Sequence, residues 1–151
     1  KDMFNLKYFF VFPGFNLRNT DISAVIGREQ IKNIDSNILS RHNNYKHFCK
    51  TLKDEVWIQK SDTDLISSLS FGIIHKNRKQ ITDALINNNV ECRPLICGSI
   101  QEQPFWYDRY PKRDLPVATK VHEQGFYIPC HQHLSFDDID FICKIILENK
   151  G

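Results

Sequence analysis

Isoleucine residues recur at helical spacing in the early part of the chain. Four of them lie four or eight residues apart, at Ile22, Ile26, Ile34 and Ile38. This spacing places them on one face of a helix. Thr20 suits an N-cap, because its hydroxyl can accept a hydrogen bond from a free backbone N–H. Gly27 inside the helix costs about 1 kcal/mol relative to Ala, and such a glycine usually lets another backbone come close. We therefore predict one long helix over residues 20 to about 52, or two helices with a break.

The later apolar segments alternate between strand-like and helix-like patterns. Extended segments are predicted over residues 55–59, 66–75, 90–95 and 126–130. Helices are predicted over residues 77–88 and 116–124, and after Ser135, where Asp138 three residues on resembles a capping box. Pro129 restricts the last strand to a sheet edge or to its own end. Residues 98–115 are predicted to be irregular, and the order of elements predicts an α+β domain with a small sheet covered by helices.

The composition is that of one globular domain. Of the 151 residues, 41% are hydrophobic and 25% are charged, and the formal net charge is +2. So small a charge gives no reason to expect nucleic acid as a partner. No run of about 18 apolar residues is present, so no membrane partner is expected. The five cysteines are an odd number at irregular spacings, which predicts reduced thiols in a cytoplasmic protein.

Residues 13–31 carry the most specific motif of the sequence. Its pattern is Gly14-Phe15-Asn16-Leu17-Arg18, then Thr20-Asp21-Ile22, Ala24-Val25-Ile26-Gly27 and Glu29-Gln30-Ile31. This pattern resembles the signature of the DegT/DnrJ/EryC1/StrS family, the vitamin B6-dependent nucleotide-sugar aminotransferases and sugar 3-dehydrases of the aspartate-aminotransferase-like superfamily. Asn19 stands where the family usually has a hydrophobic residue, and Val25 where it has a second Ala.

The resemblance implies a domain organisation. In the family this motif follows a large cofactor-binding domain, whereas this chain begins with Lys1. We therefore expect residues 1–19 to be a connector from a missing large domain. Residues 20–151 are then the small C-terminal domain of a fold-type-I pyridoxal-phosphate (PLP) enzyme, with a long N-terminal connecting helix. The catalytic Lys of the aminotransferases, or the His that replaces it in the 3-dehydrases, would lie upstream, so the chain alone is expected to be inactive.

The resemblance also assigns two residues of the motif to binding. In the family the residue matching Asn16 reaches across a dimer interface to the phosphate of pyridoxal or pyridoxamine 5'-phosphate in the other subunit. The residue matching Arg18 lies near the substrate diphosphate, where a fork of guanidinium donors suits phosphate. A homodimer with its active site at the interface is therefore implied. On composition alone, a turn-stabilising Asn and a surface Arg are the alternative interpretation.

A second stretch, residues 91–104, resembles the 3-dehydrase branch of the family. It contains Arg93-Pro94 and later Gln103-Pro104, although Ser99 stands where Asn is common. Arg93 is therefore a candidate substrate-binding residue. The alternative is an exposed or ion-paired Arg in an ordinary strand and loop.

A third and looser match covers residues 128–131, which in the family border the sugar pocket. His131 is therefore a candidate substrate contact and His133 a weaker one. The alternative interpretation is two histidines in a solvated turn, although they share a face if the segment is extended. A zinc site with Cys130 would need a second Cys/His pair at zinc spacing, which the sequence lacks, so no metal is expected.

The function implied by the resemblance is action on a nucleotide-linked 4-keto-6-deoxy sugar, in deoxysugar biosynthesis for lipopolysaccharide O-antigen. The second stretch favours 3-dehydration, and sugar 4-transamination is the alternative. A non-enzymatic α+β interaction module is a hypothesis of a different class. The aromatic residues 8–12 distinguish these hypotheses. A module would bury them in its own core, whereas a fragment would leave them exposed or ordered only against a partner.

Overall fold

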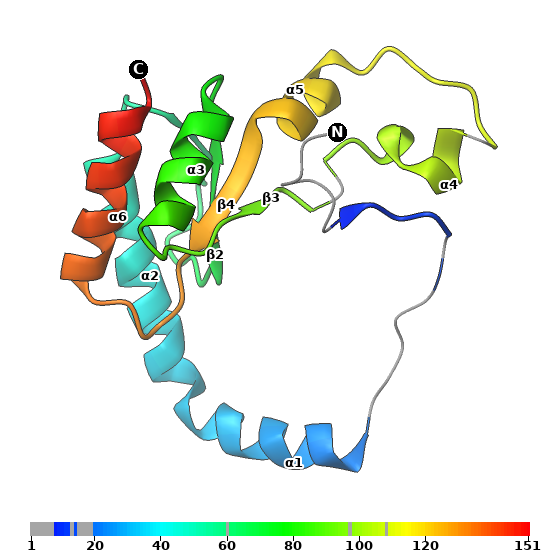
Figure 1. Cartoon of the computed structure of the whole chain (residues 1–151). Coiled ribbons are helices and arrows are strands. Elements are labelled where there is room, and N and C mark those ends of the chain that lie inside the picture. Colours follow the sequence, from blue (N-terminus) through cyan, green and yellow to red (C-terminus); the bar gives the residue numbers. More distant parts are fainter. Residues whose placement is uncertain (1–7, 13, 15–19, 60, 97, 108) are drawn as a thin grey trace.

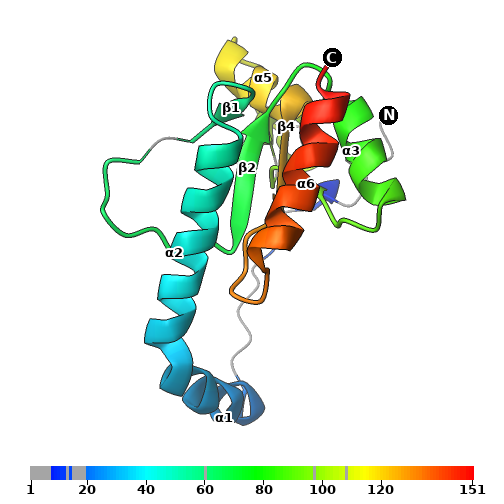
Figure 2. The ribbon, with the colours of Figure 1, turned by 90° about the vertical axis from the view of Figure 1, so that its left-hand side faces the viewer.

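A small antiparallel sheet lies at the centre of the computed structural model, which describes residues 8–12, 14, 20–59, 61–96, 98–107 and 109–151. The sheet has four strands in the order β1–β2–β4–β3 (Figure 1). They are β1 (Trp57–Ile58), β2 (Ser70–Ile74), β3 (Arg93–Pro94) and β4 (Gly125–Pro129). The helices α2 (Ile34–Thr51), α3 (Arg78–Asn87) and α6 (Phe136–Asn149) pack together on one side of it (Figure 2). The predicted α+β fold is confirmed.

Alternating side chains of the two central strands form the core. Phe71 and Ile73 of β2 are fully buried, as are Phe126 and Ile128 of β4. From the helical layer, Phe48 of α2 stacks on Phe71 with the ring centroids 5.0 Å apart. Because side chains two positions apart in a strand point to the same face, the residues between these core positions face the other way. That opposite sheet face is left open for the site described below.

The predicted N-terminal helix is broken once. It consists of α1 (Asp21–Gln30), the 3₁₀ turn η2 (Ile31–Asn33) and α2. Thr20 caps α1 as predicted, because its Oγ1 accepts a hydrogen bond from the Ser23 N–H at 3.2 Å. The first part, α1, projects away from the sheet and its covering helices (Figures 1 and 2), and none of the residues of α1 is buried.

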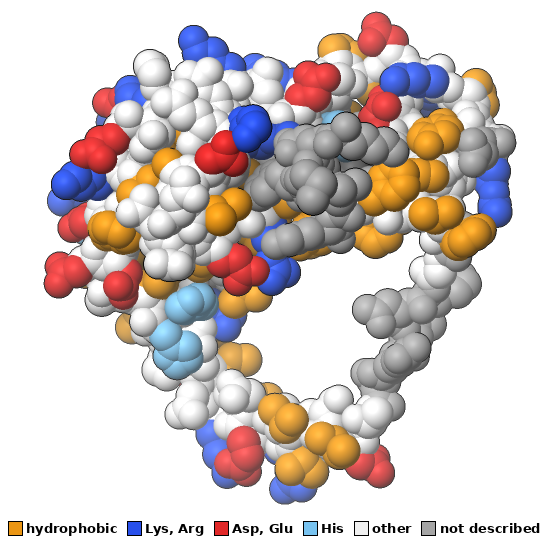
Figure 3. All heavy atoms as spheres, viewed as in Figure 1, with side chains coloured by type: hydrophobic (Ala, Val, Ile, Leu, Met, Phe, Trp, Pro, Cys, Tyr) orange, Lys and Arg blue, Asp and Glu red, His pale blue; other side chains and the backbone are white. Residues whose placement is uncertain are grey.

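The projecting helix α1 exposes its apolar residues. Ile22, Val25 and Ile26 are 74%, 62% and 58% exposed, and hydrophobic side chains gather over this helix in Figure 3. A Cβ atom added to Gly27 would meet nothing within 4 Å. The described residues therefore do not make the close backbone approach that Gly27 was predicted to allow. Exposed apolar residues at this density indicate an interaction surface.

The shorter helices and strands are mostly of the predicted type, but they begin and end at other residues than predicted. Of the extended segment 90–95, only Arg93–Pro94 pairs with β4. The segment predicted as irregular contains η3 (Ile100–Glu102) and the short helix α4 (Pro104–Tyr107). The helix α5 (Pro116–Gln124) forms as predicted. Pro129 ends β4, which is a central strand, in agreement with one of the two predicted placements. Within the described part of the chain, no helix combines the length and the apolarity that crossing a membrane requires.

Candidate functional site

A cavity of about 570 Å³ opens beside the ends of β3 and β4, on the sheet face that the helices leave uncovered. Tyr127 and Pro129 of β4 line it, and they alternate along the strand with the core-facing Phe126 and Ile128. The loops that flank the strands add an apolar wall of Leu69, Leu95 and Ile96. A concave, largely apolar site with a few polar groups is typical of small-molecule binding.

Arg93 supplies the positive charge at the polar end of this cavity. Its Nε and Nη2 atoms both donate to Glu91 Oε1, at 2.7 and 2.5 Å. The hydrogen bond with Glu91 raises the pKa of Arg93 further above its ordinary value. Both side chains are solvent-exposed, and exposed ion pairs contribute little to stability. The guanidinium can therefore exchange Glu91 for a ligand at small cost.

Two tyrosines meet beside Arg93. The Tyr8 and Tyr127 hydroxyl oxygens lie 3.3 Å apart, and Arg93 Nη1 donates to the Tyr8 hydroxyl at 3.4 Å. The hydrogen bond with Tyr127 lowers the pKa of Tyr8, whereas burial raises the pKa of Tyr127. Neither tyrosine was predicted as a site residue, because their contact joins residues far apart in the chain and leaves no local signal.

His131 lies in the turn that follows β4 and lines the cavity. Its Nδ1 accepts the backbone N–H of His133 at 3.2 Å. In the neutral ring the proton is then on Nε2, which is the nitrogen available to a ligand. The buried Asn44 of α2 fixes the turn, because its Nδ2 donates to the His131 carbonyl oxygen at 2.9 Å.

The structure brings two of the predicted residues, Arg93 and His131, into one cavity. His133 is beside His131, with ring centroids 6.0 Å apart, in a turn and not on one face of an extended segment. Asn16 and Arg18 lie outside the described residues. Among the residues that are described, no cluster of three or more His, Cys, Asp or Glu could hold a metal ion.

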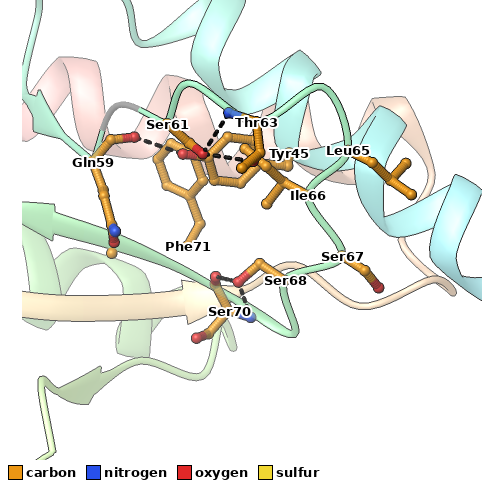
Figure 4. Close-up of a pocket in the computed structure, with 11 residues that line it drawn as sticks. Tyr45, Gln59, Ser61, Thr63, Leu65, Ile66, Ser67, Ser68, Ser70 and Phe71 are labelled. Atoms are coloured by element: carbon orange, nitrogen blue, oxygen red, sulfur yellow. Dashed lines mark hydrogen bonds between the residues drawn. The ribbon is translucent and has the colours of Figure 1, made fainter.

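A second cavity, of about 370 Å³, lies between the loop after β1 and the first residues of β2 (Figure 4). Serine and threonine hydroxyls line it, and they hydrogen-bond within the loop: Ser61 with Thr63 at 2.7 Å, and Ser68 to the Ser70 carbonyl at 2.5 Å. The Tyr45 hydroxyl donates to the Gln59 carbonyl at 2.6 Å, and burial raises the pKa of Tyr45 to about 12. These contacts order the loop, and the cavity contains no described charged side chain.

Comparison with known proteins gives a family match over nearly the whole chain. The sequence model of the DegT/DnrJ/EryC1/StrS aminotransferase family matches residues 2–147. The GDP-4-keto-6-deoxy-D-mannose 3-dehydratase of Escherichia coli O55:H7 (strain CB9615 / EPEC) is 28% identical over 154 residues, covering 96% of this chain and 40% of that protein. The GDP-perosamine synthase of Escherichia coli O157:H7 is 24% identical over 139 residues, covering 89% of this chain and 37% of that protein.

Solved structures show the same fold. The structure of E. coli GDP-4-keto-6-deoxy-D-mannose-3-dehydratase with bound hydrated PLP matches with a TM-score of 0.74 and 28% identity. The match covers 96% of this chain and 40% of that one. The chain therefore spans about 40% of the length of the relatives that it matches.

Proposed function

Because this chain belongs to the DegT/DnrJ/EryC1/StrS aminotransferase family, we propose that it is the small C-terminal domain of a PLP-dependent enzyme acting on a nucleotide-linked 4-keto-6-deoxy sugar. The favoured reaction is removal of the sugar 3-hydroxyl group, since the 3-dehydratase of E. coli O55:H7 is 28% identical over almost the whole chain. The observation that carries the proposal is the cavity in which Arg93 and His131 meet beside an apolar wall.

The proposed domain organisation is a connector over residues 1–19 and a small domain over residues 20–151. The exposed surface supports it. Phe9, Phe10 and Phe12 are 38%, 39% and 80% exposed, although a self-contained interaction module was predicted to bury the aromatic stretch 8–12. The exposed apolar residues of helix α1 support the same organisation. Both features favour a domain that contacts further protein surface over a free-standing module.

The proposed quaternary structure is a cytoplasmic homodimer with its active site at the subunit interface. In this arrangement Asn16 donates to the cofactor phosphate of the other subunit, and Arg18 contacts the substrate diphosphate. Both roles rest on the match of residues 13–31 to the family signature. The proposed role in O-antigen lipopolysaccharide synthesis rests on the same match and on the deoxysugar chemistry in the names of the relatives.

The described cavity does not by itself fit the cofactor. No lysine, the residue that forms a Schiff base with PLP, is among its described lining residues. PLP supplies an electron sink for chemistry at the sugar carbons when it is bound. Its main binding residues are therefore expected in the part of the enzyme that this chain does not contain, and the cavity described above is assigned to the substrate.

The cavity residues have distinct proposed roles toward the sugar nucleotide. The planar guanidinium of Arg93 offers several N–H donors in one plane, which suits substrate oxygens. The Nε2 atom of His131 donates a hydrogen bond to a sugar oxygen. The apolar wall of Leu69, Leu95 and Ile96 excludes water from these contacts and so strengthens them.

The proposal is tested with the protein expressed from its complete reading frame. It is incubated with GDP-4-keto-6-deoxy-D-mannose, PLP and L-glutamate, and the sugar nucleotide is analysed by mass spectrometry. A product that lacks the 3-oxygen supports dehydration. A product with an amine in place of the keto oxygen supports the alternative, transamination, which the 24% identity to GDP-perosamine synthase favours. Substrate that remains unchanged contradicts both.

A further inference from the structure

Gln103 holds the N-terminal segment by its side-chain amide. Its Oε1 accepts the Phe10 backbone N–H at 2.9 Å, and its Nε2 donates to the Tyr8 carbonyl oxygen at 3.1 Å. Gln103 is only 5% exposed. The carboxamide thus bonds one N–H and one carbonyl group on the same side of the segment 8–10, as a peptide group of a neighbouring β-strand would. Figure 1 shows the segment beside the chain that leads into α4.

The amide clamp sets the position of the Tyr8 side chain. With its backbone held by Gln103, Tyr8 places its hydroxyl 3.3 Å from the Tyr127 hydroxyl and 3.4 Å from Arg93 Nη1. Tyr127 and Arg93 both line the candidate substrate cavity. Gln103 therefore acts on the cavity from a distance, through a segment that is otherwise largely exposed.

The cluster at this end of the cavity carries no net charge. Arg93 is balanced by Glu91, and the phenols of Tyr8 and Tyr127 can each donate and accept. A set of mixed hydrogen-bond donors and acceptors suits the hydroxyl groups of a sugar, because each hydroxyl group both donates and accepts. A diphosphate only accepts hydrogen bonds, and it gains little attraction from this neutral cluster, because the Glu91 carboxylate offsets the charge of Arg93.

We propose that Gln103 is a positioning residue and that Tyr8, which it positions, binds a hydroxyl group of the sugar nucleotide. This inference rests on the proposed function for its ligand, but the clamp itself does not. If the backbone of Tyr8 and Phe10 moved away, the buried Gln103 carboxamide would lose both of these hydrogen bonds. Leaving a buried amide unpaired costs free energy, so the carboxamide favours the observed position of the segment.

The chain contains a matched control for this clamp. Gln101 is also 5% exposed and also makes two amide hydrogen bonds to the backbone. Its partners are the N–H and the carbonyl oxygen of Arg113, at 3.0 and 2.9 Å. The same substitution at Gln101 therefore removes the same chemistry and a similar buried volume, but releases a loop that does not carry Tyr8.

The test compares Gln103→Met with Gln101→Met, and Gln103→Glu serves as a second variant that keeps the acceptor. In the 151-residue chain, hydrogen exchange of the Phe10 amide is followed by NMR. In the protein from the complete reading frame, the affinity for GDP-mannose is measured by calorimetry, with Tyr8→Phe included. Loss of one ligand hydrogen bond is expected to weaken GDP-mannose binding roughly three- to tenfold in Gln103→Met and Tyr8→Phe. Gln101→Met should bind as the parent protein does.

The two measurements separate the clamp from its ligand. Faster exchange of the Phe10 amide in Gln103→Met, and not in Gln101→Met, supports the clamp, and equal exchange in all variants overturns it. Unchanged affinity in Tyr8→Phe overturns the ligand role of Tyr8. A parent protein that does not bind GDP-mannose counts against the proposed function, and the exchange experiment then decides the positioning role alone.

Discussion

Arg93 of β3 lies directly opposite Tyr127 of β4 in the antiparallel pairing of the two strands. Side chains that face each other across such a pair are on the same side of the sheet. This register therefore puts a guanidinium and a phenol together on the face that the helices leave open. The short strand β3, which contains only Arg93–Pro94, therefore determines which polar groups meet at this end of the cavity.

Replacing Arg93 with lysine is expected to weaken binding of the sugar nucleotide without unfolding the protein. Lysine keeps the charge but loses the planar fork of donors. We expect roughly a tenfold loss of affinity for GDP-mannose by calorimetry, with an unchanged melting temperature because the side chain is exposed. Arg109→Lys, at another exposed position, is the control. Equal affinities in both variants would remove Arg93 from the site.

Replacing Phe71 with alanine should strongly destabilise the domain. The ring is fully buried and packs on Phe48 and Tyr45, with centroid distances of 5.0 and 5.3 Å. Removing it is expected to lower the free energy of unfolding by about 3–5 kcal/mol in urea titrations. Phe141→Ala removes the same ring from a position that is 49% exposed, and should cost far less. A similar loss in both variants would mean that Phe71 is not in the core.

The elements that were predicted correctly are those with a repeating pattern or a local cap. Thr20 and Ser135 cap their helices because the partners are only three residues away. The limits of β3 could not be predicted, since β-branched and apolar residues mark an extended segment but not the length over which it finds a partner. Only pairing with β4 decides that.

The site was predictable only in part, for a related reason. Arg93 and His131 were predicted as candidates through the resemblance of their segments to the family, and no helical or strand period marks them. Tyr8 and Gln103 were not predicted as candidates, because their contact joins residues 95 positions apart in the chain. A long-range hydrogen bond of that kind depends on the finished fold and leaves no spacing in the sequence.

The capping box of α6 should make the stability depend on pH. Hydrogen bonds from the Ser135 side chain and backbone hold the pKa of the Asp138 carboxyl below its ordinary value. A carboxyl with a lowered folded pKa stabilises above its unfolded pKa, and this contribution is lost as the pH falls through the folded pKa. Asp138→Asn should therefore be less stable than the parent at pH 7, with the difference vanishing in acid.

Thermal unfolding across pH 2 to 7 measures this difference. Asp137→Asn is the matched control, because it removes a charge from the same first turn and leaves the capping box intact. A difference in melting temperature between the parent and Asp138→Asn that stays constant with pH would contradict a role for the carboxylate charge.

The buried cysteines should resist alkylation in the native protein. Cys130 and Cys143 are fully buried, and burial raises the pKa of each thiol to about 12. The reactive species is the thiolate, which is scarce at pH 8 in both. Among the four cysteines that the structure describes, Cys49 is only partly buried and should react first with iodoacetamide, as followed by peptide mass spectrometry. Native Cys130 reacting as fast as Cys49 would contradict its burial, and labelling in denaturant provides the control.

The proposed function requires this chain to be the small domain of a larger cofactor-dependent enzyme. The intact mass of the protein produced from its own gene, set against the encoded reading frame, decides whether it is. We predict a mass far above 17.8 kDa and a frame that continues upstream of Lys1. A mass of 17.8 kDa with a frame that begins at or near Lys1 would contradict this domain organisation, and the interaction module would then be the better hypothesis.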